Sequence, residues 1–393
     1  MSLVFKLKNV VKHYNWGDAE HIPKLLGENN ARKESWAELW MGVHPEGLSE
    51  LENNGVIMSL ADFIEKNPHE LLGTDKFENI PFLFKLLAAG KPLSIQVHPS
   101  LEQAKEGFER ENLAGIPLKA PHRNYKDANH KLEILCAIEN FRALVGLREP
   151  KEIAKRFKAF AECLTIGFLD FLTEGFQETT VVPCAFFKKL LTLSQECKEE
   201  LTDCVLKKHD VLFKNYPEYA KEWEVLIHCA SLYPNDAGIL VPLYLNVIDL
   251  LPEEAIYIPE GIPHTYISGF GVELMSNSDN VLRGGLTSKH IDTEEFLKVL
   301  DFKPFYPKIL SSHEGVYPSS YKEFTLSLFH HKEEQGSYYP TTGPAIVMIT
   351  NGSATIGDCV LRQGESAFIS ACNGKEIGFT GTHTVYIAEI GRE

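Results

Sequence analysis

The chain has 393 residues, of which 44% are hydrophobic and 24% are charged, and its formal net charge is −15. That length exceeds what one ordinary hydrophobic core needs, so the composition indicates a globular protein of two or three domains. The acidic balance argues against nucleic acid or an anionic membrane as a partner. A local cluster of Lys and Arg can still bind a phosphorylated small molecule on such a protein.

The N-terminal stretch is unlike a secretory signal, because Lys6, Lys8 and Lys12 interrupt its apolar residues. No run in the sequence approaches the ~18 apolar residues of a membrane span. The eight cysteines include no CxxC pair, and an even count alone does not make a disulfide framework in a chain of this length. We therefore expect reduced thiols in a cytoplasmic protein.

The first candidate site residues lie in two apolar stretches. Residues 34–45 are rich in tryptophan, which is typical of core, and Glu38 and His44 are weaker site candidates within them. Residues 81–87 predict an apolar strand that contains Lys85. This lysine either lies at a strand edge with its ammonium group in water or points into a site.

Residues 92–99 (PLSIQVHP) alternate apolar and polar side chains, the pattern of a half-buried strand. Gln96 and His98 share the polar face, about 7 Å apart at roughly 3.3 Å per residue. An amide oxygen and an imidazole at that spacing can approach one metal ion. The alternative is a strand whose polar face meets only water.

Residues 129–138 predict a second strand, on which Lys131 and Glu133 share one face. The other face carries Leu132 and further apolar residues. Because a carboxylate is rarely buried without a partner, we expect Glu133 to be paired or bound to metal.

Between residues 148 and 230 the pattern becomes helical. Apolar residues recur at helical spacing from Ile153 to Leu164, and two further amphipathic helices are predicted at 185–206 and 218–232. This block has no group of histidine and carboxylate residues at ligand spacing. We therefore expect a helical domain inserted into a β-rich one.

Strand character returns at 240–250 and 255–258, followed by the turn PEGIP and His264. The prolines and the glycine of that turn should hold His264 rigidly at the start of the next strand. The following segment, 271–289, is rich in Gly and Asn, which is the composition of a binding loop.

The C-terminal residues predict short strands separated by turns, one of them an Asn-Gly hairpin signal at 351–352. This pattern is typical of a β-sandwich or a jelly roll. The predicted fold is mainly β with a helical insert, in three domains. They are a discontinuous first unit, the helical insert and a C-terminal unit, at residues 1–147 with 231–303, 148–230 and 304–393.

A weak internal repeat aligns residues 254–259 with 365–370, and Lys375 then stands where the first copy has His264. Both copies predict a turn and a strand of a jelly-roll (cupin) barrel. We therefore expect two jelly-roll (cupin) β-barrels plus an α-helical domain, and the second barrel should lack metal.

The candidate metal ligands are two imidazoles, a carboxylate and an amide oxygen, from Gln96, His98, Glu133 and His264. Two nitrogens and two oxygens suit zinc, and one carboxylate leaves the ion with a net positive charge. Iron(II) is the competing metal, since two histidines and one carboxylate also form the facial triad of iron oxygenases. Spacing alone does not prove that these ligands converge.

Several windows occur in the same order as in type I mannose-6-phosphate isomerases (phosphomannose isomerases) of the cupin superfamily, and the chain resembles that family. They lie between residues 14 and 300 and are AELWMGVHPEG, FLFKLLAAGKPLSIQVHP, NYKDANHKLEI, IPEGIPHTY and VELMSNSDNVLRGGLTSKHID. The resemblance implies an aldose–ketose isomerase that interconverts D-mannose 6-phosphate and D-fructose 6-phosphate through a cis-enediol(ate). It implies one Zn²⁺ per chain, in a catalytic cupin domain. We expect a monomer.

Residue by residue, the resemblance implies zinc ligands at Gln96, His98, Glu133 and His264. It implies that Arg283 is catalytic, and it places in the substrate pocket Ser94, Lys85, Lys131, Glu273 and Lys289. One departure is visible, because Leu132 stands where the family usually has proline. We expect a local backbone change there without lost chemistry, because Lys131 and Glu133 are kept.

The residues leave the proton carrier open among Glu273, Asp279 and Lys131, whereas the guanidinium of Arg283 stays charged and is a poor general base. Two other functions also remain open. One is a non-catalytic sugar-phosphate-binding cupin, and the other is an iron(II) cupin oxygenase, which has no need of so many cations near its site. A nucleotidyltransferase is not indicated, because the sequence has no GxxxxGK[ST] phosphate loop.

Overall fold

The computed structural model describes residues 4–74, 76–164, 166, 174, 176, 179–319, 321–332, 336–341, 343–371 and 376–391. No helix in these ranges is long and apolar enough to span a lipid bilayer. Lys375, named above, and Cys372, one of the eight cysteines, lie outside them. The seven cysteines within them form no disulfide.

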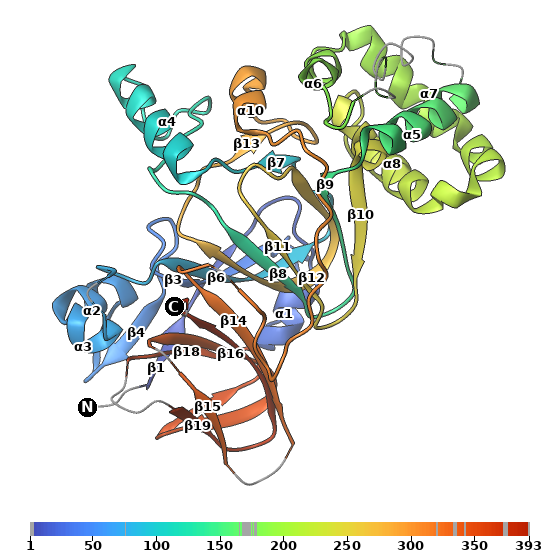
Figure 1. The fold of residues 1–393 in the computed structure, drawn as a ribbon. Helices are drawn as coiled ribbons and strands as arrows, with labels where there is room; N and C mark the ends of the chain where they lie inside the picture. The colour runs from blue at the N-terminus through green and yellow to red at the C-terminus, as the bar shows by residue number, and fades with distance from the viewer. Residues whose placement is uncertain are drawn as a thin grey trace.

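The larger of the two main sheets has ten strands (Figure 1). It carries Gln96, Glu133 and His264 of the residues predicted to bind metal, and His98 directly follows its strand β7. Its continuous path runs β10-β9-β12-β6-β3-β2, and β7, β8, β11 and β13 pair beside it. The strands are β2 (Val10–Lys12), β3 (Glu38–Gly42), β6 (Phe82–Ala89), β7 (Gln96–Val97), β8 (Glu133–Ala137), β9 (Phe141–Leu147), β10 (Leu245–Leu250), β11 (Ala255–Ile258), β12 (His264–Ser276) and β13 (Leu282–Arg283). Strand β12 is the hub, since it pairs antiparallel with β6, β7, β8 and β9.

The second sheet has eight strands and joins both ends of the chain. Its path runs β14-β20-β16-β18-β1-β4-β5, with β17 paired to β16. The strands are β1 (Val4–Lys8), β4 (Glu50–Asn53), β5 (Val56–Ser59), β14 (Thr325–His331), β16 (Ala345–Ile356), β17 (Cys359–Arg362), β18 (Ser366–Ile369) and β20 (His383–Glu389). A separate pair is formed by β15 (Ser337–Pro340) and β19 (Glu376–Phe379). The N-terminal strand therefore lies among C-terminal strands, low in Figure 1.

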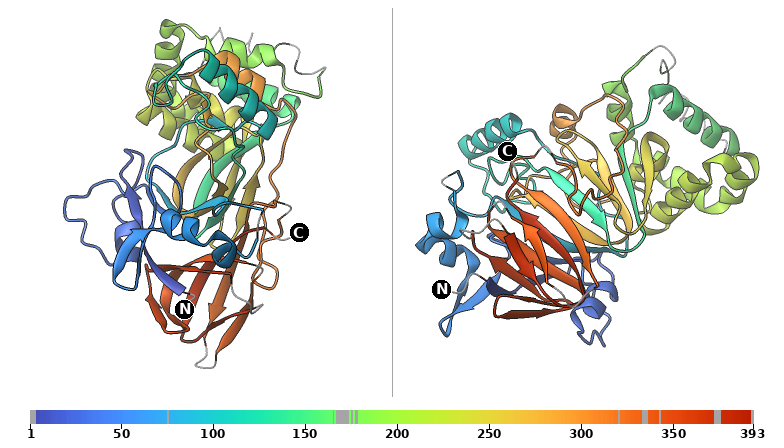
Figure 2. Two further views of the ribbon diagram at one scale, coloured as in Figure 1. Left: turned by 90° about the vertical axis from the view of Figure 1, so that its left-hand side faces the viewer. Right: turned by 60° about the horizontal axis from the view of Figure 1, so that its bottom comes forward.

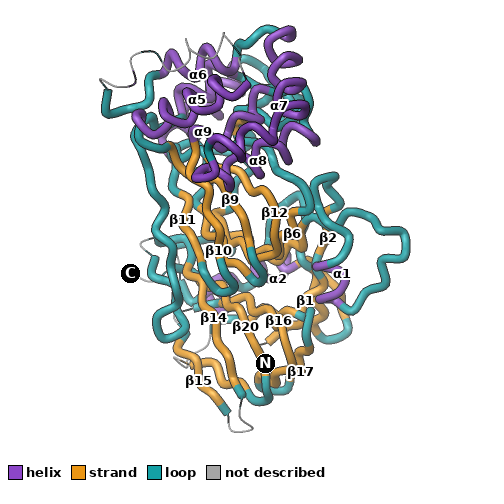
Figure 3. Tube along the Cα trace, turned by 90° about the vertical axis from the view of Figure 1, so that its right-hand side faces the viewer, coloured by secondary structure: helices purple, strands orange, loops and turns teal. Residues whose placement is uncertain are grey.

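Helices gather at one end of the ten-stranded sheet, beyond β9 and β10, as Figure 3 shows. They are α5 (Pro150–Leu164), α6 (Cys184–Leu191), α7 (Gln195–Asn215), η3 (Pro217–Tyr219), α8 (Ala220–Leu232), η4 (Ala237–Leu240) and α9 (Val241–Tyr244). Their apolar stripes share one core with Val97 and Leu282 of the sheet. The smaller helices elsewhere are α1 (His21–Leu26), α2 (Leu60–Lys66), α3 (Pro68–Leu72), α4 (Leu101–Leu113) and α10 (Thr293–Val299). In both views of Figure 2 the helical region and the eight-stranded sheet lie at opposite ends of the molecule.

One predicted helix and one predicted strand have different bounds in the structure. The helix predicted at 185–206 is two helices, because the Ser194 side chain accepts a hydrogen bond from the Cys197 N–H and begins a new one. The strand predicted at 240–250 begins only at Leu245, since the residues before it form the short helices η4 and α9. Apolar runs alone do not separate a buried helix from a buried strand.

The hairpin predicted at Asn351-Gly352 is wrong. Strand β16 runs through both residues and stays paired with β20, with a register shift between Ile349 and Asn351. Gly352 has φ +74°, the left-handed conformation that glycine adopts readily. The Asn-Gly pair therefore makes a bulge in a long strand.

The β-rich architecture with a helical region is as predicted. The two jelly-roll barrels and the three domain boundaries stay predictions.

His130 links the segment before β8 to the C-terminal part of the chain. Its Nδ1 lies 2.6 Å from Glu260 Oε1, and its Nε2 lies 2.8 Å from Glu323 Oε1. Burial opposes a charged imidazole, but the two carboxylates outweigh burial and raise the pKa of His130. The imidazole is therefore held in its charged form, with both nitrogens as donors.

His130→Gln should remove a pH-dependent part of the stability. Because the pKa of His130 is raised by folding, its contribution is full below the unfolded pKa and is lost as pH rises through the folded pKa. The gap in unfolding free energy between the parent protein and the variant should thus shrink as the pH rises above the usual pKa of histidine, about 6.5. Urea unfolding at several pH values measures this gap. A gap that widens as pH rises would contradict the stabilising role of the His130 hydrogen bonds to Glu260 and Glu323.

Candidate metal centre

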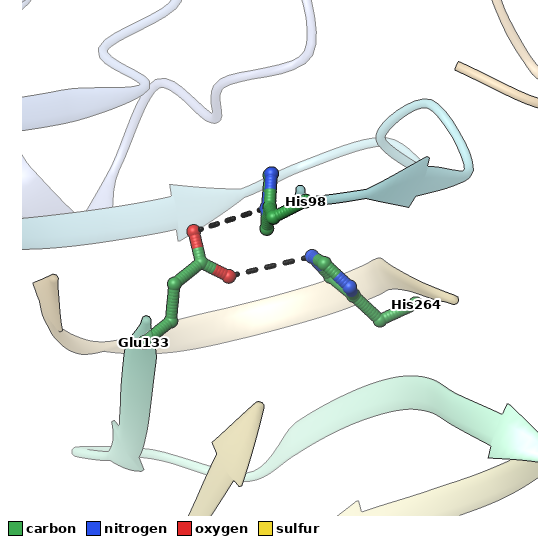
Figure 4. Close-up of side chains that lie close together, drawn as sticks. All are labelled: His98, Glu133 and His264. Carbon is green, nitrogen blue, oxygen red and sulfur yellow. Dashed lines mark ion pairs between the residues drawn. The ribbon is translucent and has the colours of Figure 1, made fainter. Parts of the chain in front are cut away.

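Three side chains from distant parts of the sequence converge beside the hub strand. His98 directly follows β7, Glu133 begins β8 and His264 begins β12. One ligand atom from each lies within 4.8 Å of the others, and all three residues are buried. Figure 4 shows both imidazole rings turned toward the carboxylate. Strand β12 pairs with both β7 and β8, so it joins the three strands whose ends carry these residues.

Backbone carbonyls fix the tautomers of the two histidines. His98 Nδ1 lies 2.8 Å from the Asn280 carbonyl oxygen, and His264 Nδ1 lies 3.0 Å from the Ile262 carbonyl oxygen. A carbonyl can only accept, so each Nδ1 carries the proton. Both Nε2 atoms therefore present lone pairs, 3.5 Å and 3.3 Å from the Glu133 oxygens.

The charges at the centre are those that a cation requires. Burial, and then the Lys131 ammonium, lower the pKa of His98 to about 4, so its imidazole is neutral. Burial would raise the pKa of Glu133, but Lys131 and the imidazoles hold it well below its usual range. The Lys131 Nζ lies 2.9 Å from Glu133 Oε1. The site thus offers one carboxylate and the neutral imidazole of His98, with the His264 imidazole beside them.

Two buried atoms of this group lack a hydrogen bond. Within the described ranges, His98 Nε2 and Glu133 Oε2 have no hydrogen-bond partner. A buried polar atom without a partner costs free energy, and a buried carboxylate costs more. These unsatisfied atoms face the same space, and their donor set suits Zn²⁺. The residues present therefore fit the metal.

Gln96 lies on β7 next to the group. Its cross-strand partners are His264 on β12 and Arg283 on β13. The Gln96 Nε2 donates to Ser94 Oγ at 3.3 Å, which leaves Oε1 as the atom available to a metal. The structure thus places the two predicted residues Ser94 and Gln96 at the edge of the centre.

Lys85 and Glu273 belong to a buried charge network. The Lys85 ammonium pairs with Glu273 and also with Glu38 Oε1 at 3.2 Å. Tyr266 donates to Glu273 at 2.7 Å, and the Trp40 indole N–H donates to Glu38 at 2.9 Å. Burial would lower the pKa of Lys85, but the two carboxylates raise it, so the lysine stays charged.

Arg283 lies on β13 opposite Gln96, and Lys289 follows it six residues later in the chain. Burial lowers the pKa of Arg283, and burial together with the charge of Arg283 lowers the pKa of Lys289. Neither forms an ion pair with a carboxylate among the residues that the structure describes. They are thus two cations whose charges are not neutralised by the protein.

Sequence reasoning missed the residues that support the first histidine. Asp127 accepts hydrogen bonds from the Asp279 N–H at 2.7 Å and from Ser278 Oγ at 2.9 Å. The side-chain oxygen of the fully buried Asn280 accepts a hydrogen bond from the Lys126 N–H at 2.7 Å. The backbone carbonyl of Asn280 accepts the hydrogen bond from His98 Nδ1. These partners lie more than 150 residues apart in the sequence, so no local pattern could have revealed them.

Asp279 and His44 form a further pair beside this loop. The His44 Nε2 lies 3.4 Å from Asp279 Oδ2. Burial lowers the pKa of His44. The Asp279 side chain is 39% exposed, so it is the one carboxylate of the predicted proton carriers that solvent reaches.

A family model matches the first part of the chain. Residues 4–150 match the model described as "Phosphomannose isomerase type I, catalytic domain". The matched range contains all the predicted site residues up to Glu133.

Relatives match almost the whole chain. The mannose-6-phosphate isomerase of Salmonella typhimurium is 36% identical over 387 residues, which cover 93% of this chain and 94% of the relative. The Escherichia coli (strain K12) enzyme of the same name is also 36% identical, over 380 residues. These relatives extend the match to the helical region and the second sheet.

Solved structures match the fold along its full length. A crystal structure of a variant phosphomannose isomerase from Salmonella typhimurium has a TM-score of 0.89 at 33% identity, covering 100% of both chains. The Salmonella typhimurium structure bound to fructose 6-phosphate and zinc has a TM-score of 0.87 at 32% identity, again covering 100% of both chains. By sequence and by fold, this chain belongs to the type I phosphomannose isomerase family.

Proposed function

We propose that the chain is a zinc-dependent aldose–ketose isomerase that interconverts D-mannose 6-phosphate and D-fructose 6-phosphate through a cis-enediol(ate). The observation that carries the proposal is the buried group of His98, Glu133 and His264, with its unsatisfied ligand atoms. The relatives bear the name mannose-6-phosphate isomerase, and one solved relative holds both zinc and fructose 6-phosphate.

His98, Glu133 and His264 would hold one zinc ion per chain, with Gln96 as the fourth ligand. Bound zinc would supply a positive charge that stabilises negative charge developing on the sugar oxygens. The Nδ1 hydrogen bonds of the two histidines keep both rings oriented for that role. Lys131, 2.9 Å from Glu133, adds a second positive charge at the same place.

Arg283 and Lys289 bind the phosphate group of the sugar, and Ser94 donates a hydrogen bond to the substrate. Two cations without carboxylate partners in the described ranges suit a dianion, because they need not break an ion pair to bind it. Lys85 and Glu273 form the wall of the pocket with Glu38. Their mutual ion pairs fix the position of the Lys85 charge.

Asp279 carries the proton between C1 and C2. Of the three candidates, Glu273 is 3% exposed and Lys131 is 11% exposed, and each is engaged in an ion pair. The Asp279 side chain is 39% exposed. Burial lowers the pKa of its neighbour His44, which favours the neutral imidazole. A carboxylate that solvent and substrate can reach is the better general base.

The two main sheets are the cores of two cupin barrels, and only the first holds metal. A sugar-binding cupin without catalysis would not need the Asp279 carboxylate beside the metal ligands. An iron(II) oxygenase would not need the cations Lys131, Arg283 and Lys289.

The chain acts as a monomer on a small-molecule sugar phosphate, without a nucleic-acid or membrane partner, and we expect it in the cytoplasm.

Removal of the metal should abolish turnover of mannose 6-phosphate, and added zinc should restore it. The physical reason is that the developing charge on the sugar oxygens then loses its strongest partner. Coupled detection of fructose 6-phosphate measures the rate before chelation, after it and after zinc is returned. Protein with stoichiometric zinc and no turnover would instead support a binding module, and recovery only with iron(II) and oxygen uptake would support an oxygenase.

Glu133→Gln should strongly reduce the zinc that the protein retains through dialysis. The amide keeps the size of the side chain but removes the negative charge that offsets the cation. Metal analysis measures the loss, and Glu218→Gln, an exposed carboxylate in η3, is the matched control. Full zinc content in the Glu133 variant would remove this residue from the ligand set.

Arg283→Ala should lower kcat/KM about 100-fold or more while zinc content is kept, because the transition state and the phosphate lose a fixed positive charge. Steady-state kinetics with metal analysis measures both quantities. Arg32→Ala, at a side chain that is 88% exposed, is the control. Loss of zinc from the Arg283 variant would mean that Arg283 supports the structure of the centre.

A further inference from the structure

We infer that the end of the helical region positions the cationic loop of the substrate pocket, and that Asp236 is the positioning residue. The loop is residues 283–289, which begins with Arg283 and ends with Lys289. The inference rests on the proposed function only in that the loop binds the phosphate of the sugar.

Asp236 joins the two parts through both of its oxygens. Its Oδ1 accepts the Gly238 N–H at 2.7 Å, which begins the short helix η4. Its Oδ2 accepts the Thr287 N–H at 3.1 Å, across 51 residues of sequence. One carboxylate therefore caps η4 and holds the middle of the cationic loop.

The two backbones also touch directly. A Cβ atom added at Gly238 would lie 2.7 Å from the Leu286 backbone nitrogen and 3.1 Å from the Gly285 carbonyl carbon. A Cβ atom added at Gly285 would lie 2.9 Å from the Gly238 Cα, and Gly285 has φ +138°. The contact thus leaves no room for a side chain at Gly238 or at Gly285.

Backbone hydrogen bonds connect the loop to the segment that carries Gln96. The Gly284 N–H donates to the Ile95 carbonyl at 2.9 Å, and the Ile95 N–H donates to the Gly285 carbonyl at 3.0 Å. Next to this pair, Arg283 is the cross-strand partner of Gln96. A shift of the loop would therefore move Arg283 and the strand that carries Gln96.

A second contact from the helical region reaches the same strand. The Tyr233 hydroxyl, just after α8, donates to the Pro92 carbonyl at 2.6 Å. The helical region thus holds the segment before β7 and the segment after β13.

The side chain of Arg283 depends on this support. Within the described ranges, its Nη1 donates a 3.5 Å hydrogen bond to the Val281 carbonyl, two residues earlier in the chain. With no carboxylate partner in the described ranges, the guanidinium is aimed mainly by its backbone. The spacing of the Arg283 and Lys289 charges, and hence the affinity for phosphate, should follow the position of the loop.

The test compares three variants of the zinc-loaded full chain. Asp236→Ala removes both acceptors, Asp236→Asn keeps one acceptor oxygen, and Gly238→Ala pushes on the loop without removing any hydrogen-bonding group. Asp203→Ala, which breaks an exposed ion pair with Lys207 on α7, is the matched control. The probe is inorganic phosphate, measured as a competitive inhibitor and by calorimetry.

Asp236→Ala and Gly238→Ala should raise the KM for mannose 6-phosphate and the phosphate dissociation constant together, by about tenfold or more. Asp236→Asn should fall between these variants and the control, and zinc content should stay unchanged. Variants that melt at lower temperature but bind phosphate as the parent does would overturn the inference, because Asp236 would then be only structural.

The two proposals fail in different ways. If the parent protein binds phosphate but does not isomerise the sugar, the proposed function fails, and the calorimetric series still tests the loop. If it isomerises the sugar and the variants leave phosphate affinity unchanged, the role of Asp236 fails alone.

Discussion

The structure depends on one buried carboxylate. Glu133 is 2% exposed, and an ion at such a depth costs several kcal/mol unless opposite charge surrounds it. Lys131 satisfies one of its oxygens, while the other oxygen and His98 Nε2 lack a hydrogen bond within the described ranges. A divalent cation held between these two atoms removes that cost. The buried atoms without hydrogen bonds therefore favour the binding of a metal ion.

The surrounding chain keeps those ligands in place at several levels. The hub strand β12 pairs with four neighbouring strands, and backbone carbonyls orient both imidazoles. Among the residues near these strands, the Lys85 network holds a fixed charge, and β13 and the loop after it carry the cations Arg283 and Lys289. The helical region contributes no ligand, but it packs on the strands of the site and contacts the loop through Asp236.

Local patterns were enough for the features that depend on neighbours in sequence. An apolar run predicted the strand that carries Lys85, alternation predicted the strand that carries Glu133, and helical spacing predicted the helix that begins at Pro150. The same patterns failed where a single capping residue or bulge decides, as at Ser194 and Gly352.

The site was predictable only through its motifs. No spacing rule brings Glu133 beside His264, or Glu38 beside Lys85, because these pairs form through strand register between distant segments. Residue types and burial suggested the candidate ligands, and the resemblance to a family implied the same set before the fold was known. Neither assigned a role to Asp127, Asn280 or Asp236, because their hydrogen bonds reach the backbone of distant segments.

Anomalous diffraction at the zinc edge, from crystals of the zinc-loaded chain, tests the central claim most directly. The account predicts a single strong peak per chain, bounded by the Nε2 atoms of His98 and His264 and by the Glu133 carboxylate. A peak elsewhere, or none at this position in protein that retains zinc and isomerises mannose 6-phosphate, would contradict it.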